Sequence, residues 1–411
     1  MKHLHPLVPS LFLTLPLIAL SAFSADWPNY HGPNQDGVSY ESGWSLDWKT
    51  DPPDMLWKTN VGRGFSSVTV VGDRLFTMGF KKDLDTIYCL DAETGKEIWS
   101  YSYPSVLFDD GDQYGGGACS TPTVANGKVF TLSKLGLVHC FDAQTGEVLW
   151  SKQFAEELGT KPGRWGFSGS ILIDEGKGIL DLGRTVAFDP SSGDVLWKTK
   201  DYEPGYSTPT TMTLGENKFI LVFNSYGLVI LEPESGKEVC AHPWETDYGV
   251  NSCIPQVIGD KIYLSADYGH GCALLRFNGD SLDLVWEKTT MMNHFNTASI
   301  VDGYAYGFNG HVSREGEFKC ISLETGDQVW ETRDVMKGSN LLVDSKLLIL
   351  TGSGELVLAE PSPNEFKEIG RIQALGGRCW TEPAFSNGRV YCRNSRGDLV
   401  CLDLGTSQEA G

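Results

Sequence analysis

Short apolar runs separated by tight turns dominate this chain. One stretch predicts strands at 120–124, 128–132 and 136–142, with a turn at Asn126-Gly127 between the first two. Asn-Gly between β-forming runs is a strong hairpin signal. No long helical period appears anywhere. Four short strands per unit in an up-and-down meander are typical of the blade of a β-propeller.

A ten-residue motif recurs along the chain and marks the last hairpin of each unit. Residues 90–99 are Leu-Asp-Ala-Glu-Thr-Gly-Lys-Glu-Ile-Trp, and 141–150 and 188–197 repeat this pattern closely. Asp followed by Thr-Gly or Ser-Gly favours a tight turn, because the carboxylate caps nearby amides and glycine adopts positive φ. Partial copies stand at 231–240, 277–286 and 321–330, with a degenerate copy at 359–369.

The spacing of these units gives the number of blades. Their last strands recur at intervals of about 40–50 residues, the length of one propeller blade. A strand at 55–61 has no partner strands before it, while 382–404 supplies three strands without a fourth. Pairing the two closes the ring and removes its exposed edges. The sequence therefore predicts an all-β fold, an eight-bladed β-propeller of four-stranded antiparallel blades over residues 55–404, closed by an N-terminal strand.

The motif Leu/Phe-Asp-Ala-x-Thr-Gly-x-x-x-Trp resembles the repeat of pyrroloquinoline-quinone (PQQ)-like propellers, the quinoprotein alcohol dehydrogenase-like superfamily. That superfamily includes quinoprotein alcohol dehydrogenases and the non-catalytic outer-membrane assembly lipoprotein BamB. The opening at 27–37 is also similar to the start of secreted bacterial proteins with PQQ-like repeats. The resemblance implies that each repeat Trp packs between neighbouring blades, a structural role for Trp99, Trp150, Trp197, Trp286 and Trp330.

Both ends of the chain lie outside the predicted propeller. Residues 1–24 have a basic start, an uncharged apolar run and small residues before Ala25, as expected of a signal peptide. Residues 25–54 form an N-terminal extension and 405–411 a C-terminal tail. No Cys stands at the cleavage junction, which argues against a lipid anchor. We expect a periplasmic or extracellular protein that is monomeric and has no transmembrane segment.

The net charge limits the possible partners, and the positions of the cysteines bear on disulfide formation. The net charge of −20 opposes binding to nucleic acid and to anionic lipid. Of the ten cysteines, Cys89, Cys140, Cys320 and Cys401 occupy matching positions in separate repeats. Small apolar residues at one repeat position favour core packing over a disulfide framework. Individual bridges among the other six stay open.

Candidate chemistry is sparse. The enzymes of the superfamily hold PQQ with calcium on the propeller axis, against a disulfide between adjacent cysteines. This chain has no adjacent cysteines, so PQQ with calcium is expected only if the chain is an enzyme. Otherwise we predict no cofactor, no metal and no catalytic residue. The acidic stretch 109–112 and the hydrolase-like motif at 279–282 are interpreted as a solvated loop and a turn.

The first residues of each innermost strand are the best candidates for a ligand site, because they line the axial mouth. They form a polar and aromatic set suited to an anionic or sugar-like ligand, or to a peptide. The set consists of Arg63, Arg164, Trp165, Tyr206, Asn251, His294, Asn296, Asn340, Arg378 and Trp380.

Three functions remain open from the sequence. The first is a non-catalytic scaffold that binds a protein or cell-envelope component. The second is a periplasmic PQQ-dependent oxidoreductase acting on alcohols or sugars, which would have to bind PQQ with calcium. The third is a carbohydrate-binding propeller, suggested by Trp165 and Trp380, which would lose glycan binding when either Trp is removed.

Overall fold

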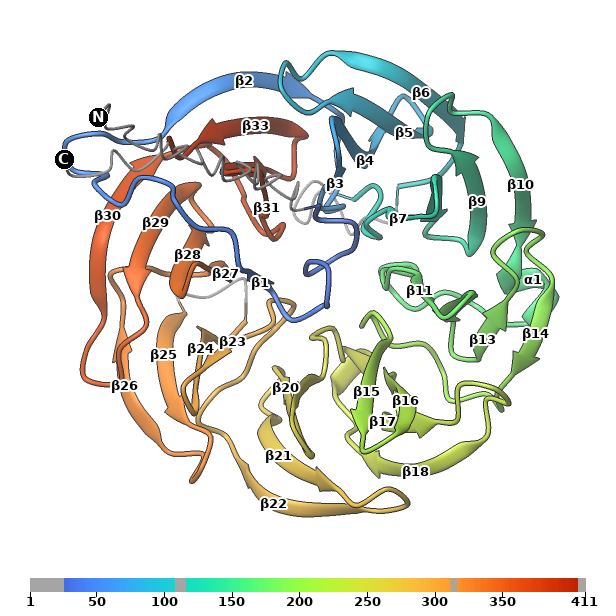
Figure 1. Ribbon diagram of the computed structural model, residues 1–411. Coiled ribbons are helices and arrows are strands. Elements are labelled where there is room, and N and C mark those ends of the chain that lie inside the picture. Colours follow the sequence, from blue (N-terminus) through green and yellow to red (C-terminus); the bar gives the residue numbers. More distant parts are fainter. Residues whose placement is uncertain (1–25, 108–115, 312–315, 406–411) are drawn as a thin grey trace, which may run out of the picture.

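Eight β-sheets surround a common axis in the computed structural model, which describes residues 26–107, 116–311 and 316–405 (Figure 1). The eight-bladed all-β prediction is therefore confirmed. The predicted signal peptide, the acidic stretch 109–112 and residues 406–411 of the tail lie outside the described residues.

Each blade runs from an innermost strand at the axis to an outermost strand at the rim. Blade 1 contains β3 (Thr69–Val71), β4 (Arg74–Lys81), β5 (Leu84–Asp91) and β6 (Glu97–Pro104). Blade 2 contains β7 (Thr123–Ala125), β8 (Lys128–Leu132), β9 (Leu137–Asp142) and β10 (Val148–Gln153). Blade 3 contains β11 (Leu172–Asp174), β12 (Lys177–Asp181), β13 (Thr185–Phe188) and β14 (Val195–Lys198). Blade 4 contains β15 (Thr210–Leu214), β16 (Asn217–Phe223), β17 (Gly227–Leu231) and β18 (Glu238–Pro243).

The second half of the ring repeats this order. Blade 5 contains β19 (Gln256–Ile258), β20 (Lys261–Ala266), β21 (Gly271–Phe277) and β22 (Leu282–Lys288). Blade 6 contains β23 (Ser299–Val301), β24 (Tyr304–Asn309), β25 (Glu317–Ser322) and β26 (Gln328–Thr332). Blade 7 contains β27 (Gly338–Val343), β28 (Lys346–Thr351), β29 (Glu355–Glu360) and β30 (Lys367–Gln373). Helical structure is limited to α1 (Phe154–Leu158) and the 3-10 turn Asp247–Gly249 within the described ranges.

Blade 8 joins the two ends of the described chain. It contains β31 (Ala384–Ser386), β32 (Arg389–Arg393) and β33 (Asp398–Asp403), and its rim strand is β2 (Asp54–Asn60). β2 pairs antiparallel with β33 from Asp54 opposite Asp403 to Asn60 opposite Asp398. The predicted closing strand at 55–61 is shifted by one residue. Closure in this way gives blade 8 its fourth strand and covers the edge that β33 would otherwise expose.

The repeat motif connects neighbouring blades through its Trp. Trp99 of blade 1 donates its indole N–H to the Ala143 carbonyl in the turn of blade 2, at 3.1 Å. Asp142 shapes that turn by accepting from the Thr145 amide and hydroxyl, and these bonds lower the pKa of Asp142. The same indole-to-turn bond recurs from Trp57 to Ala92, Trp150 to Pro190, Trp197 to Pro233, Trp286 to Leu323 and Trp330 to Ser362.

The turn glycine completes this contact. Gly146 has φ 73°, and a Cβ built there would lie 2.5 Å from Cδ2 of Trp99. Glycine therefore gives the turn its backbone conformation and lets the indole lie flat against it. In blade 4, Cys240 stands in place of the Trp, and the motif copy of blade 5 that follows it has Leu282 in place of the turn glycine.

Gly146→Ala is expected to lower the free energy of unfolding by about 3 kcal/mol, from overpacking against Trp99 added to positive-φ strain. Gly127→Ala is the matched control, because Gly127 has φ 71° in another hairpin of blade 2 with nothing within 4 Å. It should cost only about 1 kcal/mol. Urea unfolding of both variants measures the difference. Equal losses would show that contact with Trp99 contributes nothing.

The repeat cysteines pack inside the blades. Cys89, Cys140, Cys320 and Cys401 are fully buried. None of the ten cysteines forms a disulfide, and burial raises the pKa of Cys89 to about 11. The predicted core role of the matching cysteines is therefore confirmed, and these thiols act as small apolar groups.

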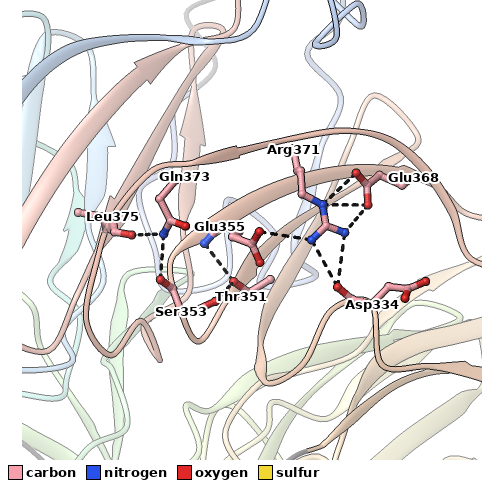
Figure 2. A network of polar contacts seen from close by, with 8 residues as sticks. All are labelled: Asp334, Thr351, Ser353, Glu355, Glu368, Arg371, Gln373 and Leu375. Atoms are coloured by element: carbon pink, nitrogen blue, oxygen red, sulfur yellow. Dashed lines mark hydrogen bonds and ion pairs between the residues drawn. The ribbon is translucent and has the colours of Figure 1, made fainter.

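Blade 7 carries the degenerate copy of the motif and contains a polar network that reaches blade 6 (Figure 2). Arg371 on β30 forms ion pairs with Glu368 and, at 3.3 Å, with Glu355 on β29. Its guanidinium also donates to the Asp334 carbonyl, which follows the last strand of blade 6. Gln373 donates to the Ser353 carbonyl at 3.0 Å. Arg371 thus adds a second link between blades 6 and 7, beside the indole bond from Trp330 to Ser362.

The N-terminal extension crosses the centre of the ring, where Figure 1 shows it as the dark-blue segment between β3 and β1. We call residues 27–39 the axial plug. Its last part, β1 (Val38–Ser39), pairs parallel with β27 of blade 7. Bonds join the plug to innermost strands around the ring: Trp27 to Val70, Pro28 to Val124, Gln35 to Pro209 and Gly37 to Leu342. The plug therefore bridges blades 1, 2, 4 and 7.

Candidate functional site

A pocket of about 390 Å³ lies on the propeller axis beside the plug. Most of its walls come from segments that lead into the innermost strands, while Lys134, Tyr268 and His311 come from loops between the two middle strands of a blade. Among the described residues, every blade except blade 7 contributes to the lining. Aromatic residues make up half of the lining. They are Tyr30, Phe65, Trp165, Tyr206, Tyr248, Tyr268, His294, Phe295, His311 and Trp380.

Most of these rings contact one another, one after the next, around the pocket wall. Trp165 contacts Tyr206 and Tyr248, with ring centroids 5.8 and 6.1 Å apart. Tyr248 contacts Tyr268 at 5.9 Å, and Tyr268 contacts His294 at 5.4 Å. The series of ring contacts continues from His294 to Phe295 and from Phe295 to Trp380, which stacks on Phe65. We call this continuous set of rings the aromatic belt.

Two arginines lie over rings of the belt. The Arg164 guanidinium lies 5.4 Å from the ring centroids of both Trp165 and Tyr248. That of Arg378 lies 4.3 Å from Trp380. Cation–π contacts of this kind hold the guanidinium groups and orient the indoles. Tyr248 is 62% exposed and has φ 62°, so its ring marks the open mouth of the pocket.

Two histidines form one side of the belt. The rings of His294 and His311 lie 4.7 Å apart, and the Tyr268 hydroxyl lies 3.4 Å from Nε2 of His311. Burial, and secondly the neighbouring His311, lowers the pKa of His294 to about 3. His294 is therefore neutral at physiological pH. Its imidazole presents an uncharged ring with one donor nitrogen and one acceptor nitrogen.

The plug side of the pocket is more polar. Glu382 is buried there and is hydrogen-bonded to His31 of the plug, with Oε2 2.8 Å from Nδ1. The Ser67 hydroxyl donates to the Glu382 carbonyl at 2.7 Å. Burial, and secondly the Glu382 carboxylate, raises the pKa of Tyr30 well above its ordinary value. The second oxygen of Glu382, Oε1, is buried without a hydrogen-bond partner.

Half of the predicted mouth residues line this pocket: Arg164, Trp165, Tyr206, His294 and Trp380. Arg378 does not line it but stacks on Trp380. Arg63 is exposed, and its backbone bonds to Phe80 of β4.

The three asparagines are buried and bond to neighbouring loops and strands. The Asn251 amide donates to the Asn224 and Trp244 carbonyls, Asn296 to the Gly338 carbonyl, and Asn340 to Ser299 and Tyr306. Their side chains connect blades and are not available to a ligand in the pocket.

Sequence reasoning missed Tyr30, Tyr248, Tyr268 and Glu382. Tyr248 and Tyr268 lie in connections between strands, where no repeat pattern marks a position. Phe65 and Phe295 were also missed, although Phe65 is two residues after the predicted Arg63 and Phe295 lies next to the predicted His294. Tyr30 belongs to the motif at 27–37, whose path across the axis has no local signal.

Comparison with known proteins places the chain in a family. The family described as "Outer membrane protein assembly factor BamB" matches residues 41–131 and 110–332, which together span more than half of the chain. The chain belongs to this family. It is a PQQ-like β-propeller of the quinoprotein alcohol dehydrogenase-like superfamily, as the repeat motif implied.

Individual relatives of this PQQ-like propeller are distant. The outer membrane protein assembly factor BamB of Moranella endobia is 23% identical over 351 residues, covering 79% of this chain and 85% of that protein. The crystal structure of BamB from Moraxella catarrhalis has a TM-score of 0.64 at 14% identity, covering 85% of this chain and 99% of that one. Quinohemoprotein alcohol dehydrogenase from Comamonas testosteroni has a TM-score of 0.66 at 13% identity, covering 94% and 82%. At such identities the structural likeness shows the fold.

The side chains of the axial pocket do not match a PQQ and calcium site. Glu382 is the one carboxylate among the described lining residues, and His31 already occupies one of its oxygens. No three His, Cys, Asp or Glu residues converge on a metal position anywhere in the described ranges. Cys119 lines the pocket, but the sequence has no neighbouring cysteine that would form the disulfide of the superfamily's enzymes.

The hydrolase-like motif does not assemble either. Ser281 lies in the turn after β21, where its hydroxyl donates to Asp280. His270 lies at the other end of β21, and its Nδ1 is 3.0 Å from the Glu245 carbonyl oxygen. A seven-residue strand separates them by about 20 Å. No helix in the described part of the chain is long and apolar enough to span a bilayer.

Proposed function

We propose that this chain is a non-catalytic binding scaffold of the cell envelope, exported by its N-terminal segment, which holds an envelope component at its axial mouth. The observation that carries this proposal is the aromatic belt, a concave surface of half-buried rings with two orienting arginines. Such surfaces favour binding through large rigid contacts. Membership of the BamB family supports a scaffold role, and the described lining residues offer no constellation of nucleophile, base and metal.

The acidic surface supports an envelope partner over nucleic acid. With a net charge of −20, the protein repels phosphate backbones, whereas the belt itself carries Arg164 and Arg378. The outer surface therefore repels anionic polymers, whereas the mouth at the axis is apolar and carries two arginines. Selectivity for the mouth follows from that contrast.

Trp165→Ala is expected to abolish retention of envelope components by the immobilised protein, because Trp165 joins two rings and Arg164 in the belt. Loss of a central aromatic contact costs about 2 kcal/mol or more, roughly a 30-fold drop in affinity. Envelope extract is passed over each variant and the retained components are quantified by mass spectrometry. Tyr248→Ala, which removes an exposed ring, repeats the test without disturbing the interior.

Tyr40→Ala is the matched control, because Tyr40 is 79% exposed and lies outside the pocket. It should retain the same components as the parent protein. Retention that is equal in all variants would overturn the proposed site. Thermal unfolding with PQQ and Ca²⁺ tests the enzyme alternative: a ligand at a hundred times its Kd adds about 2.7 kcal/mol. A clear rise in Tm would replace the scaffold by the oxidoreductase.

A further inference from the structure

Three buried polar side-chain atoms in the axial pocket have no hydrogen-bond partner among the described residues. They are Oε1 of Glu382, Nδ1 of His294 and the hydroxyl of Tyr206, and all three side chains line the pocket. Glu382 is 4% exposed. Buried polar atoms are almost always hydrogen-bonded, and leaving one unpaired costs about 1–3 kcal/mol. A ligand that pairs with these atoms removes that cost.

The surfaces between these polar atoms are aromatic faces. Trp380 lies against Phe295 and Phe65, and Trp165 lies against Tyr206. A complementary ligand therefore needs apolar faces that stack on rings and polar groups around its edge. It also needs to donate hydrogen bonds to a carboxylate oxygen. A pyranose ring meets these requirements, because its C–H faces stack and its equatorial hydroxyls both donate and accept.

The charges of the lining select against charged ligands. Lys134 and Arg164 oppose an ammonium group, while Glu382 opposes a carboxylate at the plug side. Glu382 is already paired with His31, so its remaining oxygen needs a neutral donor rather than a buried cation. A hydroxyl supplies that donor without adding buried charge.

A second groove extends this surface beyond the pocket. It has a volume of about 780 Å³ and is lined by 159–163, 201–204, 225–226, 245–246 and 248–249. Tyr248 lines both spaces, so a ligand that leaves the pocket over this ring enters the groove directly. Asp201, Glu203 and Glu245 provide acceptors along it. The groove accommodates further sugar units of a chain whose end occupies the pocket.

We infer that the axial pocket is a sugar-binding site that takes the terminal ring of a neutral glycan, with stacking on Trp380 and Trp165 and a hydroxyl donating to Glu382. This inference rests on the proposed function, since it names the chemistry of the envelope component held at the mouth. The groove beside Tyr248 makes oligosaccharides better ligands than single sugars.

An array of immobilised oligosaccharides tests this inference. It carries neutral, uronic-acid and amino-sugar chains, and it is probed with the purified protein. We expect binding to neutral chains, with at least a tenfold loss in Trp380→Ala and in Glu382→Gln, which keeps a hydrogen bond to His31 but removes the carboxylate. Tyr40→Ala should bind as the parent does. Circular dichroism and Tm identify any variant that is misfolded.

Each outcome separates the two proposals. Binding to charged chains alone, or to no chain, overturns the neutral sugar site. If Trp165-dependent retention of envelope components persists in that case, the scaffold proposal stands and only its ligand class is wrong. If retention and array binding are both absent, both proposals fail. Neutral binding that survives both Trp380→Ala and Glu382→Gln overturns the assignment to this pocket.

Discussion

Replacing Arg393 with Met is expected to lower the free energy of unfolding by about 3 kcal/mol or more. Arg393 lies on β32 of blade 8 and is 1% exposed. Its guanidinium donates to the carbonyls of Ser66, Met78 and Gly62, at 2.7, 2.6 and 3.0 Å, and to Thr77 at 3.0 Å. All four acceptors belong to blade 1 or to the segment that enters it.

The physical reason is the loss of several charge-assisted bonds at once. Burial lowers the pKa of Arg393 only to about 10, so the group stays charged at neutral pH and its bonds are the strong kind. Each acceptor left without a donor costs about 1–3 kcal/mol, and relief from burying a cation offsets part of the total. Met fills the volume but provides no donor.

Arg389→Met is the matched control on the same strand. Arg389 also reaches blade 1, through a partly exposed ion pair with Glu93 at 3.4 Å, and such pairs contribute about 0–1 kcal/mol. Urea unfolding of both variants, with Arg393→Lys as a third, measures the contrast. Lys keeps the charge but cannot span four acceptors, so we expect an intermediate loss. Equal, small losses in both Met variants would rule out a special role of Arg393 at the seam.

The seam shows what sequence can and cannot predict here. The closing strand was predictable because β2 and β33 each carry incomplete blade patterns that complement each other. The tight turn and the role of the Trp were also predictable, because the motif that contains both recurs several times along the sequence. Arg393 has no such signal. Three of its four acceptors are backbone carbonyls more than three hundred residues earlier, and every residue type has the same carbonyl group, so the sequence does not mark these positions.

The axial pocket was predictable in part for the same reason. Trp165, His294 and Trp380 stand just before innermost strands, so the repeat indicated their position. The same rule placed Asn251 and Asn340 in the predicted set, but their side-chain amides donate to backbone carbonyls and do not line the pocket. Glu382 was within reach of the pattern, but its partner His31 is 351 residues away. Only the path of the plug brings the two together.

His31→Ala is expected to cost about 3–5 kcal/mol of unfolding free energy and to weaken binding in the pocket. His31 is fully buried and holds the Glu382 carboxylate at 2.8 Å. Removing His31 leaves both carboxyl oxygens of the buried Glu382 without a hydrogen-bond partner and empties the space that the imidazole filled, and the two losses together account for a cost of this size. The same change releases Glu382 from its fixed position, so the oxygen offered to a ligand is no longer oriented.

A double-mutant cycle with Glu382→Gln isolates the pair from other effects of the plug. Once the carboxylate is absent, losing His31 no longer strands a charge, so the double variant should be more stable than the sum of single losses predicts. Unfolding in urea gives the coupling, and the affinity for immobilised neutral oligosaccharides gives the second measure. Strict additivity would mean that His31 acts only by filling space. Coupling of about 2 kcal/mol or more would show that the plug positions the Glu382 carboxylate through this one contact. The segment that closes the propeller axis would then also orient the ligand-binding group of the pocket.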